Sequence, residues 1–188
     1  MQKKELILNY LAENLSKGRL KHILGVAETA INLAINYGAD PQKAELAGLL
    51  HDCAKEWKKE ALLAKAESHN LIWDKTDILN PHLLHARVGA LIAAEEFDIQ
   101  DTEILNAITQ HTLGKPNMSL LEKILFVADI IEPNRPLAWS APVKESLEKN
   151  GLNNAIITAI QASVKEIIDK KAFIHPLTIT TYNFYLNL

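Results

Sequence analysis

The segment from Leu120 to Ile131 constrains the fold more than any other part of the chain. It is preceded by Ser119 and carries Glu122, and this S-x-x-E pattern is a capping box that predicts a helix start. The run from Ile124 to Ile131 is apolar around nearly the whole circumference of a helix, so the helix must be surrounded by other elements. Asp129 lies within that run and has no solvated face to point to. A buried carboxylate of this kind needs a cation or hydrogen-bond donors.

Apolar residues at helical spacing fill most of the remaining chain, and turn or capping residues mark the ends. Asp40-Pro41, Asn80-Pro81 and Asp101-Thr102 each predict a helix start. After a proline-rich connection from Glu132 to Pro142, a short helix and then a long one are expected, and in the tail a helix is favoured from Thr178. The sequence therefore predicts an all-α fold in one domain, residues 1–188. The main predicted helices cover about 2–14, 19–37, 41–52, 57–69, 81–97, 102–111, 120–131 and 151–171.

The composition is that of an ordinary globular protein, with 48% hydrophobic and 23% charged residues in a chain of 188. A formal net charge of -3 argues against a general DNA-binding surface. The single cysteine, Cys53, excludes a disulfide framework within the chain. The first residues lack the apolar core of a signal peptide, and no run reaches membrane-spanning length. We therefore expect a soluble cytoplasmic protein that binds neither DNA nor a membrane.

Histidines and aspartates with metal-ligand chemistry recur on the faces of five helices that are predicted to be buried. A single core histidine is more often satisfied by a backbone carbonyl than by a metal. Several together with a buried aspartate have one shared explanation, a metal centre. Imidazole and carboxylate donors suit iron, manganese, cobalt or zinc, and six of them could serve two ions with Asp52 as the bridge. The six candidates are His22, His51, Asp52, His85, His111 and Asp129.

The order of these residues and their neighbours resembles a known family. The motifs are Arg19-x-x-His22-x-x-x-Val26, His51-Asp52-x-Ala54-Lys55, His85-x-x-x-Gly89-Ala90, His111-Thr112-x-Gly114 and Ala128-Asp129-x-Ile131-Glu132-Pro133-x-Arg135. Together they are similar to the HD-domain phosphohydrolases, and within them to the bacterial symmetrical bis(5′-nucleosyl)-tetraphosphatases. The resemblance implies an HD-domain helical bundle with a C-terminal helical extension.

The resemblance also implies an activity, the hydrolysis of diadenosine tetraphosphate and related dinucleoside polyphosphates to two nucleoside diphosphates, ADP and also GDP. It implies a dinuclear centre, with iron as the expected metal, and is compatible with a homodimer. One ion would be bound by His22, His51, Asp52 and Asp129, and the other by Asp52, His85 and His111.

Roles at the reaction centre follow from the same resemblance. The catalytic residues would be Asp52, Lys55, His85 and His111, and Arg19, Lys55 and Arg135 would neutralise phosphate charge. The substrate-binding residues would be Arg19, His22, Lys55, His85, His111, Thr112, Arg135 and a base-contacting segment formed by Ala172, Phe173, Ile174, His175, Pro176 and Leu177.

Two alternatives in function and one in ligand assignment stay open at this point. The same chemistry could act on a mononucleotide, a deoxynucleoside triphosphate, an alarmone or a cyclic dinucleotide. The chain could instead be a non-catalytic nucleotide-binding regulator. His82 lies three residues before His85 and therefore competes with it as a ligand on the same helix face.

Overall fold

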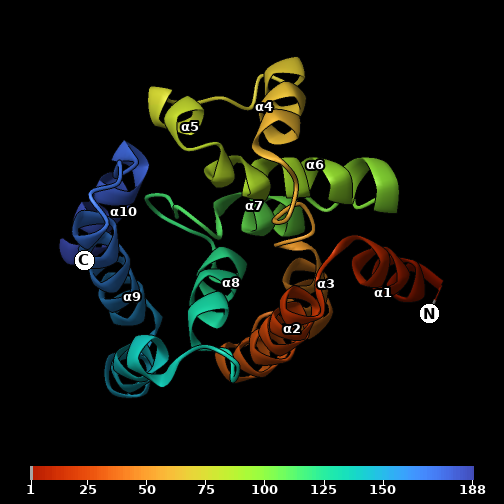
Figure 1. Cartoon of the computed structure of the whole chain (residues 1–188). Coiled ribbons are helices and arrows are strands. Elements are labelled where there is room, and N and C mark those ends of the chain that lie inside the picture. Colours follow the sequence, from red (N-terminus) through yellow and green to blue (C-terminus); the bar gives the residue numbers. More distant parts are fainter. Residues whose placement is uncertain (1) are drawn as a thin grey trace.

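The fold is known from a computed structural model that describes residues 2–188. Within these residues every regular element is a helix, which confirms the predicted all-α class (Figure 1). No helix in this range is both long and apolar enough to cross a membrane. The elements are α1 (Gln2–Asn14), α2 (Lys17–Tyr37), α3 (Pro41–Leu50), α4 (Lys59–Ser68), α5 (Lys75–Leu79), the 3₁₀ helix η1 (Pro81–Leu84), α6 (His85–Phe97), α7 (Thr102–Gln110), α8 (Leu120–Ile131), α9 (Leu137–Asp169) and α10 (Pro176–Leu186).

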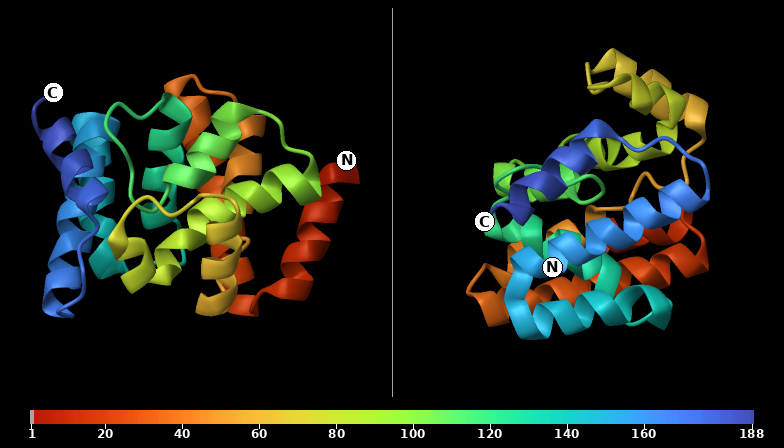
Figure 2. Two further views of the ribbon diagram at one scale, coloured as in Figure 1. Left: turned by 90° about the horizontal axis from the view of Figure 1, so that it is seen from above. Right: turned by 90° about the vertical axis from the view of Figure 1, so that its left-hand side faces the viewer.

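Helix α8 is the central element, as its apolar sequence predicted. The predicted capping box is present, because the Ser119 side chain accepts from the Glu122 amide and the Glu122 side chain accepts from the Ser119 amide. Helix α8 packs against α2, α3 and α7 on one side and against α9 on the other (Figure 1). Helix α10 lies along α9, at the side of the molecule opposite the N-terminus (Figure 2). Residues from distant parts of the sequence therefore meet around α8.

Helices α2 and α3 approach each other closely at a glycine. A Cβ atom added to Gly48 would lie 2.6 Å from the Cα atom of Ala27, so a side chain at this position would push the helices apart. Gly48 lies one helical turn before His51, and Ala27 lies little more than one turn after His22. The close contact therefore brings the ends of these two imidazoles together.

The structure departs from the prediction around residues 74–84. Helix α5 was not predicted, although Asp74 and Asp77 form a capping box at its start. Asn80-Pro81 opens the 3₁₀ helix η1 rather than the first turn of α6, and α6 begins at His85. At five residues, α5 is too short to show a helical apolar period in the sequence.

The C-terminal third also differs in its boundaries. Helix α9 starts at Leu137, so the predicted connection ending at Pro142 is too long, and Pro142 lies inside the helix. Gly151, with φ of 77°, breaks α9 into a short arm and a long arm, in agreement with the predicted pair of helices. Helix α10 begins at Pro176 rather than at Thr178, because the His175 side chain accepts a hydrogen bond from the Leu177 amide and caps the helix.

Candidate metal centre

Three of the four histidines in the candidate ligand set directly follow the end of a helix, where carbonyl groups of the last turn are free to accept. His51 follows α3 and donates from Nδ1 to the Gly48 carbonyl at 2.7 Å. His111 follows α7 and donates to the Ile108 carbonyl at 2.7 Å. His85 follows η1 and donates to the His82 carbonyl. Because a carbonyl can only accept, Nδ1 carries the proton in each ring and Nε2 presents a lone pair.

His22 and His51 form one donor set with the two aspartates. Their Nε2 atoms are 3.4 Å apart. Asp129 Oδ1 lies 3.0 Å from Nε2 of His22 and 3.8 Å from Nε2 of His51. Asp52 Oδ2 lies 3.7 Å and 3.5 Å from the same two nitrogens. Four atoms with lone pairs therefore converge from α2, α8 and the turn after α3.

His85 and His111 form a second donor set on the other oxygen of Asp52. Asp52 Oδ1 lies 3.1 Å from Nε2 of His85 and 3.6 Å from Nε2 of His111. The two nitrogens are 3.1 Å apart. The carboxylate of Asp52 thus faces the first donor set with Oδ2 and the second with Oδ1, which is the arrangement that a bridging ligand requires.

The donor sets fit metal ions on two grounds. Donors that share an ion at bond lengths of about 2.1 Å lie roughly 3–3.5 Å from one another, and the observed separations are close to this spacing. Within the described residues, Asp52 Oδ1 is also buried without a hydrogen-bond donor. A buried acceptor surrounded by the lone pairs of imidazoles needs a cation or a proton. Nitrogen and carboxylate donors suit divalent iron, manganese, cobalt or zinc.

The electrostatics keep both aspartates ionised. Burial opposes ionisation, but imidazoles together with Lys55 hold the pKa of Asp52 well below its ordinary value. Against the same burial, His22 and Arg135 hold the pKa of Asp129 well below its ordinary value. Burial and the Lys55 ammonium lower the pKa of His85 to about 4, so this imidazole is neutral near pH 7 and available as a ligand.

The basic residues predicted to meet phosphate border the two donor sets. Arg19 donates to Asp52 Oδ2 at 2.8 Å, and Arg135 donates to Asp129 Oδ1 at 2.6 Å. Lys55 Nζ lies 3.2 Å from Nε2 of His85. Thr112 Oγ1 lies 3.1 Å from Nε2 of both His85 and His111. The structure therefore brings all four of these residues to the predicted centre, and each basic group contacts a candidate ligand.

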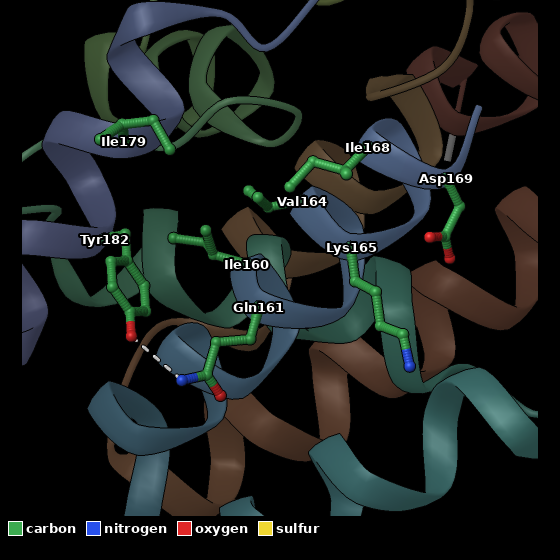
Figure 3. A pocket seen from close by; sticks show the side chains of 8 residues that line it. All are labelled: Ile160, Gln161, Val164, Lys165, Ile168, Asp169, Ile179 and Tyr182. Carbon is green, nitrogen blue, oxygen red and sulfur yellow. Dashed lines mark hydrogen bonds between the residues drawn. The ribbon is translucent and has the colours of Figure 1, made fainter. Parts of the chain in front are cut away.

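Two hollows open beside this centre and share Arg135. One, of about 180 Å³, is lined by Lys55, His111, Thr112, Phe126, Asp129, Ile130, Arg135, Trp139 and Ser163. The other, of about 250 Å³, includes Arg19, His22, Glu132 and Arg135. A larger hollow of about 370 Å³ between α9 and α10 is lined by apolar residues such as Ile160, Val164 and Ile179 (Figure 3). It contains none of the predicted site residues.

The predicted base-contacting segment is not joined to the donor sets. Among residues 2–188, no hydrogen bond or ion pair links residues 172–177 to any of the six candidate ligands. The side chain of His175 is buried, with Nε2 3.5 Å from Asp77 Oδ1. Asp77 in turn accepts from Arg87 Nη1 at 2.6 Å. His175 therefore packs at the start of α10 beside the Asp77–Arg87 pair of α5 and α6, whereas Phe173 in the same segment is exposed.

Two further residues clarify the ligand set. His82 is exposed and contributes its carbonyl to His85 rather than its imidazole to the cluster, so the geometry favours His85 as the ligand. Glu132 was noted in the sequence motif without a role, but it is buried and its Oε1 lies 3.1 Å from Nδ1 of His22. The two residues are 110 positions apart in the chain, and no local spacing could have revealed the contact.

Comparison with known proteins agrees with this geometry. The family model described as HD domain matches residues 19–134, a range that includes all six candidate ligands. A crystal structure from Clostridium acetobutylicum, described as a predicted HD superfamily hydrolase involved in NAD metabolism, superposes with a TM-score of 0.93 at 39% sequence identity. The match covers 98% of this chain and 97% of that one.

Sequence relatives carry a more specific name. A protein of Halalkalibacterium halodurans named symmetrical bis(5′-nucleosyl)-tetraphosphatase is 45% identical over 181 residues, covering 94% of this chain and 93% of the relative. A Bacillus subtilis protein of the same name is 38% identical over 187 residues, covering 98% of each chain. The similarity therefore extends over nearly the full length of both relatives.

Proposed function

This chain belongs to the HD-domain family, and we propose that it is a metal-dependent enzyme that hydrolyses diadenosine tetraphosphate symmetrically to two ADP. The substrate is that of the relatives named above, which match the chain over almost its whole length. The observation that carries the chemistry is the position of Asp52, whose two carboxylate oxygens face two separate histidine sets. Two ions held by these donors would supply an activated water near neutral pH and would withdraw charge from phosphate oxygens.

The residues of the chain prepare this site for a strongly anionic substrate. Three carboxylates, Asp52, Asp129 and Glu132, are offset by three basic groups, so the side chains alone do not attract a polyphosphate. With divalent ions bound, the centre would be net positive and would attract an anionic substrate. In the proposed enzyme Asp52 joins both donor sets, and His22, His51, Asp129, His85 and His111 complete them.

The basic groups retain donors that could contact phosphate. Arg19 uses Nη1 on Asp52, and its Nη2 makes no hydrogen bond within the described part of the chain. Arg135 uses Nε and Nη2 on Asp129. A guanidinium has five N–H donors, so each arginine can hold a carboxylate and a phosphate oxygen together. We propose that Arg19, Arg135 and Lys55 bind the phosphates in this way, with Thr112 as an additional donor.

In this proposal the nucleoside halves occupy the two hollows that share Arg135. Trp139 lines the smaller hollow and offers an aromatic face for a base. The segment from Ala172 to Leu177 remains a proposed base contact, mainly through the exposed Phe173. We also propose iron as the resident metal, GDP as a product from guanine-containing substrates, a cytoplasmic location, one domain over residues 1–188, and assembly as a homodimer.

Product analysis tests the proposed function. Purified protein with Fe²⁺ or Mn²⁺ is incubated with diadenosine tetraphosphate, a mononucleotide, a deoxynucleoside triphosphate, an alarmone and a cyclic dinucleotide, and the products are separated by ion-exchange chromatography. We expect ADP as the sole product from diadenosine tetraphosphate and slower turnover of the others. AMP together with ATP would exclude symmetrical cleavage. Faster turnover of another nucleotide would assign the site to that substrate. If none of the nucleotides is hydrolysed, the result would favour a non-catalytic nucleotide-binding regulator.

Substitution of Arg135 tests the phosphate contact. Arg135→Ala is expected to weaken ADP binding about 10- to 100-fold, because a hydrogen bond to a charged group contributes roughly 1.5–3 kcal/mol. Both metal ions should be retained, because Arg135 contacts Asp129 but is not itself a donor to the ions. Isothermal titration calorimetry gives the affinity, and elemental analysis gives the metal content. Lys149→Ala is a matched control that removes an exposed positive charge paired with Glu145. If Arg135→Ala and Lys149→Ala bind ADP equally well, Arg135 has a structural role and does not contact phosphate.

A further inference from the structure

The four histidines of the centre are not oriented in the same way. His51, His85 and His111 donate from Nδ1 to a carbonyl three residues earlier, at the end of a helix. His22 lies in the interior of α2, where the carbonyls are occupied by the hydrogen bonds of the helix. Its Nδ1 donates instead to Oε1 of Glu132 at 3.1 Å. Among the four imidazoles, that of His22 therefore donates to a carboxylate, whereas the other three donate to carbonyls.

The carboxylate of Glu132 is itself held in place. Glu132 is 1% exposed, and its Oε2 accepts from the Asn134 main-chain N–H at 2.7 Å and from Asn134 Nδ2 at 2.9 Å. Asn134 Nδ2 also reaches the Lys21 carbonyl on α2 at 3.4 Å. One oxygen thus faces His22 while the other is fixed by the turn after α8. A carboxylate can accept on both sides at once, whereas an amide cannot.

Helix α2 leaves room for this carboxylate by having a glycine next to it. A Cβ atom added to Gly25 would collide with Oε2 of Glu132 and would lie 2.9 Å from Nδ2 of Asn134. Both contacts are too short for a real side chain. Gly25 is three residues after His22 and so lies on the same face of the helix. A Cβ atom added to Gly18, on the same helix, would meet no atom within 4 Å among the described residues, so Gly18 offers a matched control.

The two donor sets consequently differ in charge and in donor number. The His22 side has Asp129 and Glu132 of its own, offset by Arg19 and Arg135, together with His51 as a further donor. Among the residues that the structure describes, the His85 side has no carboxylate apart from the shared Asp52, and Lys55 Nζ lies 3.2 Å from Nε2 of His85. A carboxylate that accepts the Nδ1 proton strengthens an imidazole as a ligand, whereas a neighbouring cation opposes metal binding.

We propose that Glu132 is a positioning residue that makes the His22 side the tighter of two unequal metal sites, so that this side fills first. The proposal rests on the two-metal centre of the proposed function. Glu132 acts through His22 and does not contact the ions. Gly25 is required because any larger residue would displace the Glu132 carboxylate.

Titration of the metal-free protein with Mn²⁺ alone tests the order of filling. We expect two classes of site in the wild type. In Glu132→Gln the tighter class should weaken about 10- to 100-fold, the usual effect of losing such a partner, while the weaker class is unchanged. Gly25→Ala should reproduce this loss, and Gly18→Ala should bind Mn²⁺ as the wild type does. Lys55→Gln should have the converse effect. It should raise the Mn²⁺ affinity of the weaker sites and leave that of the tighter sites unchanged.

Wild-type affinities in both Glu132→Gln and Gly25→Ala would overturn the proposal, as would an equal loss from both classes. If Glu132→Gln does not fold, judged by circular dichroism of the metal-free protein, Gly25→Ala and Lys55→Gln decide the matter. The titration requires no substrate, so it is independent of the product analysis. If the wild type cleaves symmetrically but the variants bind Mn²⁺ as the wild type does, the inference about Glu132 is wrong and the proposed function stands. If the variants bind Mn²⁺ more weakly but the wild type cleaves another nucleotide, the inference about Glu132 stands and only the substrate assignment is wrong.

Discussion

An Asp52→Ala variant is expected to lose both metal ions and to hydrolyse diadenosine tetraphosphate at least about 10²- to 10³-fold more slowly than the wild type, the scale seen when one electrostatic group at a reaction centre is removed. Each oxygen of Asp52 faces a different histidine set, so a single substitution removes a donor from both. The helical fold should persist, because the core around α8 does not depend on this side chain. Elemental analysis, circular dichroism and a turnover assay measure the three effects.

Two variants make the interpretation specific. Asp52→Asn keeps the shape of the side chain but replaces one oxygen with an N–H donor, so it should lose at least one ion. Asp169→Ala removes an exposed carboxylate from α9 and should leave metal content and turnover unchanged. Full metal content and activity in Asp52→Ala would contradict the bridging role.

Arg87→Ala is expected to lower the free energy of unfolding by about 3–5 kcal/mol, because it leaves the carboxylate of Asp77 buried without its charge partner. Arg87 is 2% exposed and Asp77 is fully buried. Arg87 Nη1 also donates to the Leu71 carbonyl at 3.0 Å, and its guanidinium lies 3.9 Å from the centroid of the Trp73 ring. The cluster joins α5 to α6, which carries His85. Urea denaturation followed by circular dichroism measures the change.

A comparison of buried and exposed pairs completes that experiment. Lys149→Ala breaks an exposed pair with Glu145 and should change the free energy of unfolding by less than about 1 kcal/mol. The double variant Asp77→Ala/Arg87→Leu should recover part of the stability lost in Arg87→Ala, because neither charge is then left alone. If Arg87→Ala were as stable as Lys149→Ala, the cluster would not hold these helices together.

The sequence predicted the elements whose ends have strong capping signals. The capping box at Ser119, the Asp40 cap and the Asp101 cap all mark helices that begin where expected. Two helices in particular were not predicted correctly. Helix α5 was missed despite its capping box, because five residues are too few to show an apolar period. The start of α10 was misplaced because a histidine caps it, and histidine seldom serves as a helix cap.

The candidate ligands were predictable for a different reason. Asp129 interrupts an apolar run, and the histidines recur within motifs that resemble a family. The groups that orient them were not predictable, because the contact of His22 with Glu132 depends on how α2 and the turn after α8 approach in space. The same holds for Asp77 and Arg87, which look like ordinary surface residues in the sequence. His175, which was predicted to contact a base, is buried together with them in the fold.

The metal content of wild-type protein purified without oxygen tests the central claim most directly. The metal concentration is measured by inductively coupled plasma mass spectrometry and divided by the protein concentration. We expect two metal ions per chain, with iron as the main element. That ratio is what two donor sets joined through Asp52 require. A fully active protein with one ion per chain would contradict the shared bridge and the assignment of His85 and His111 as ligands.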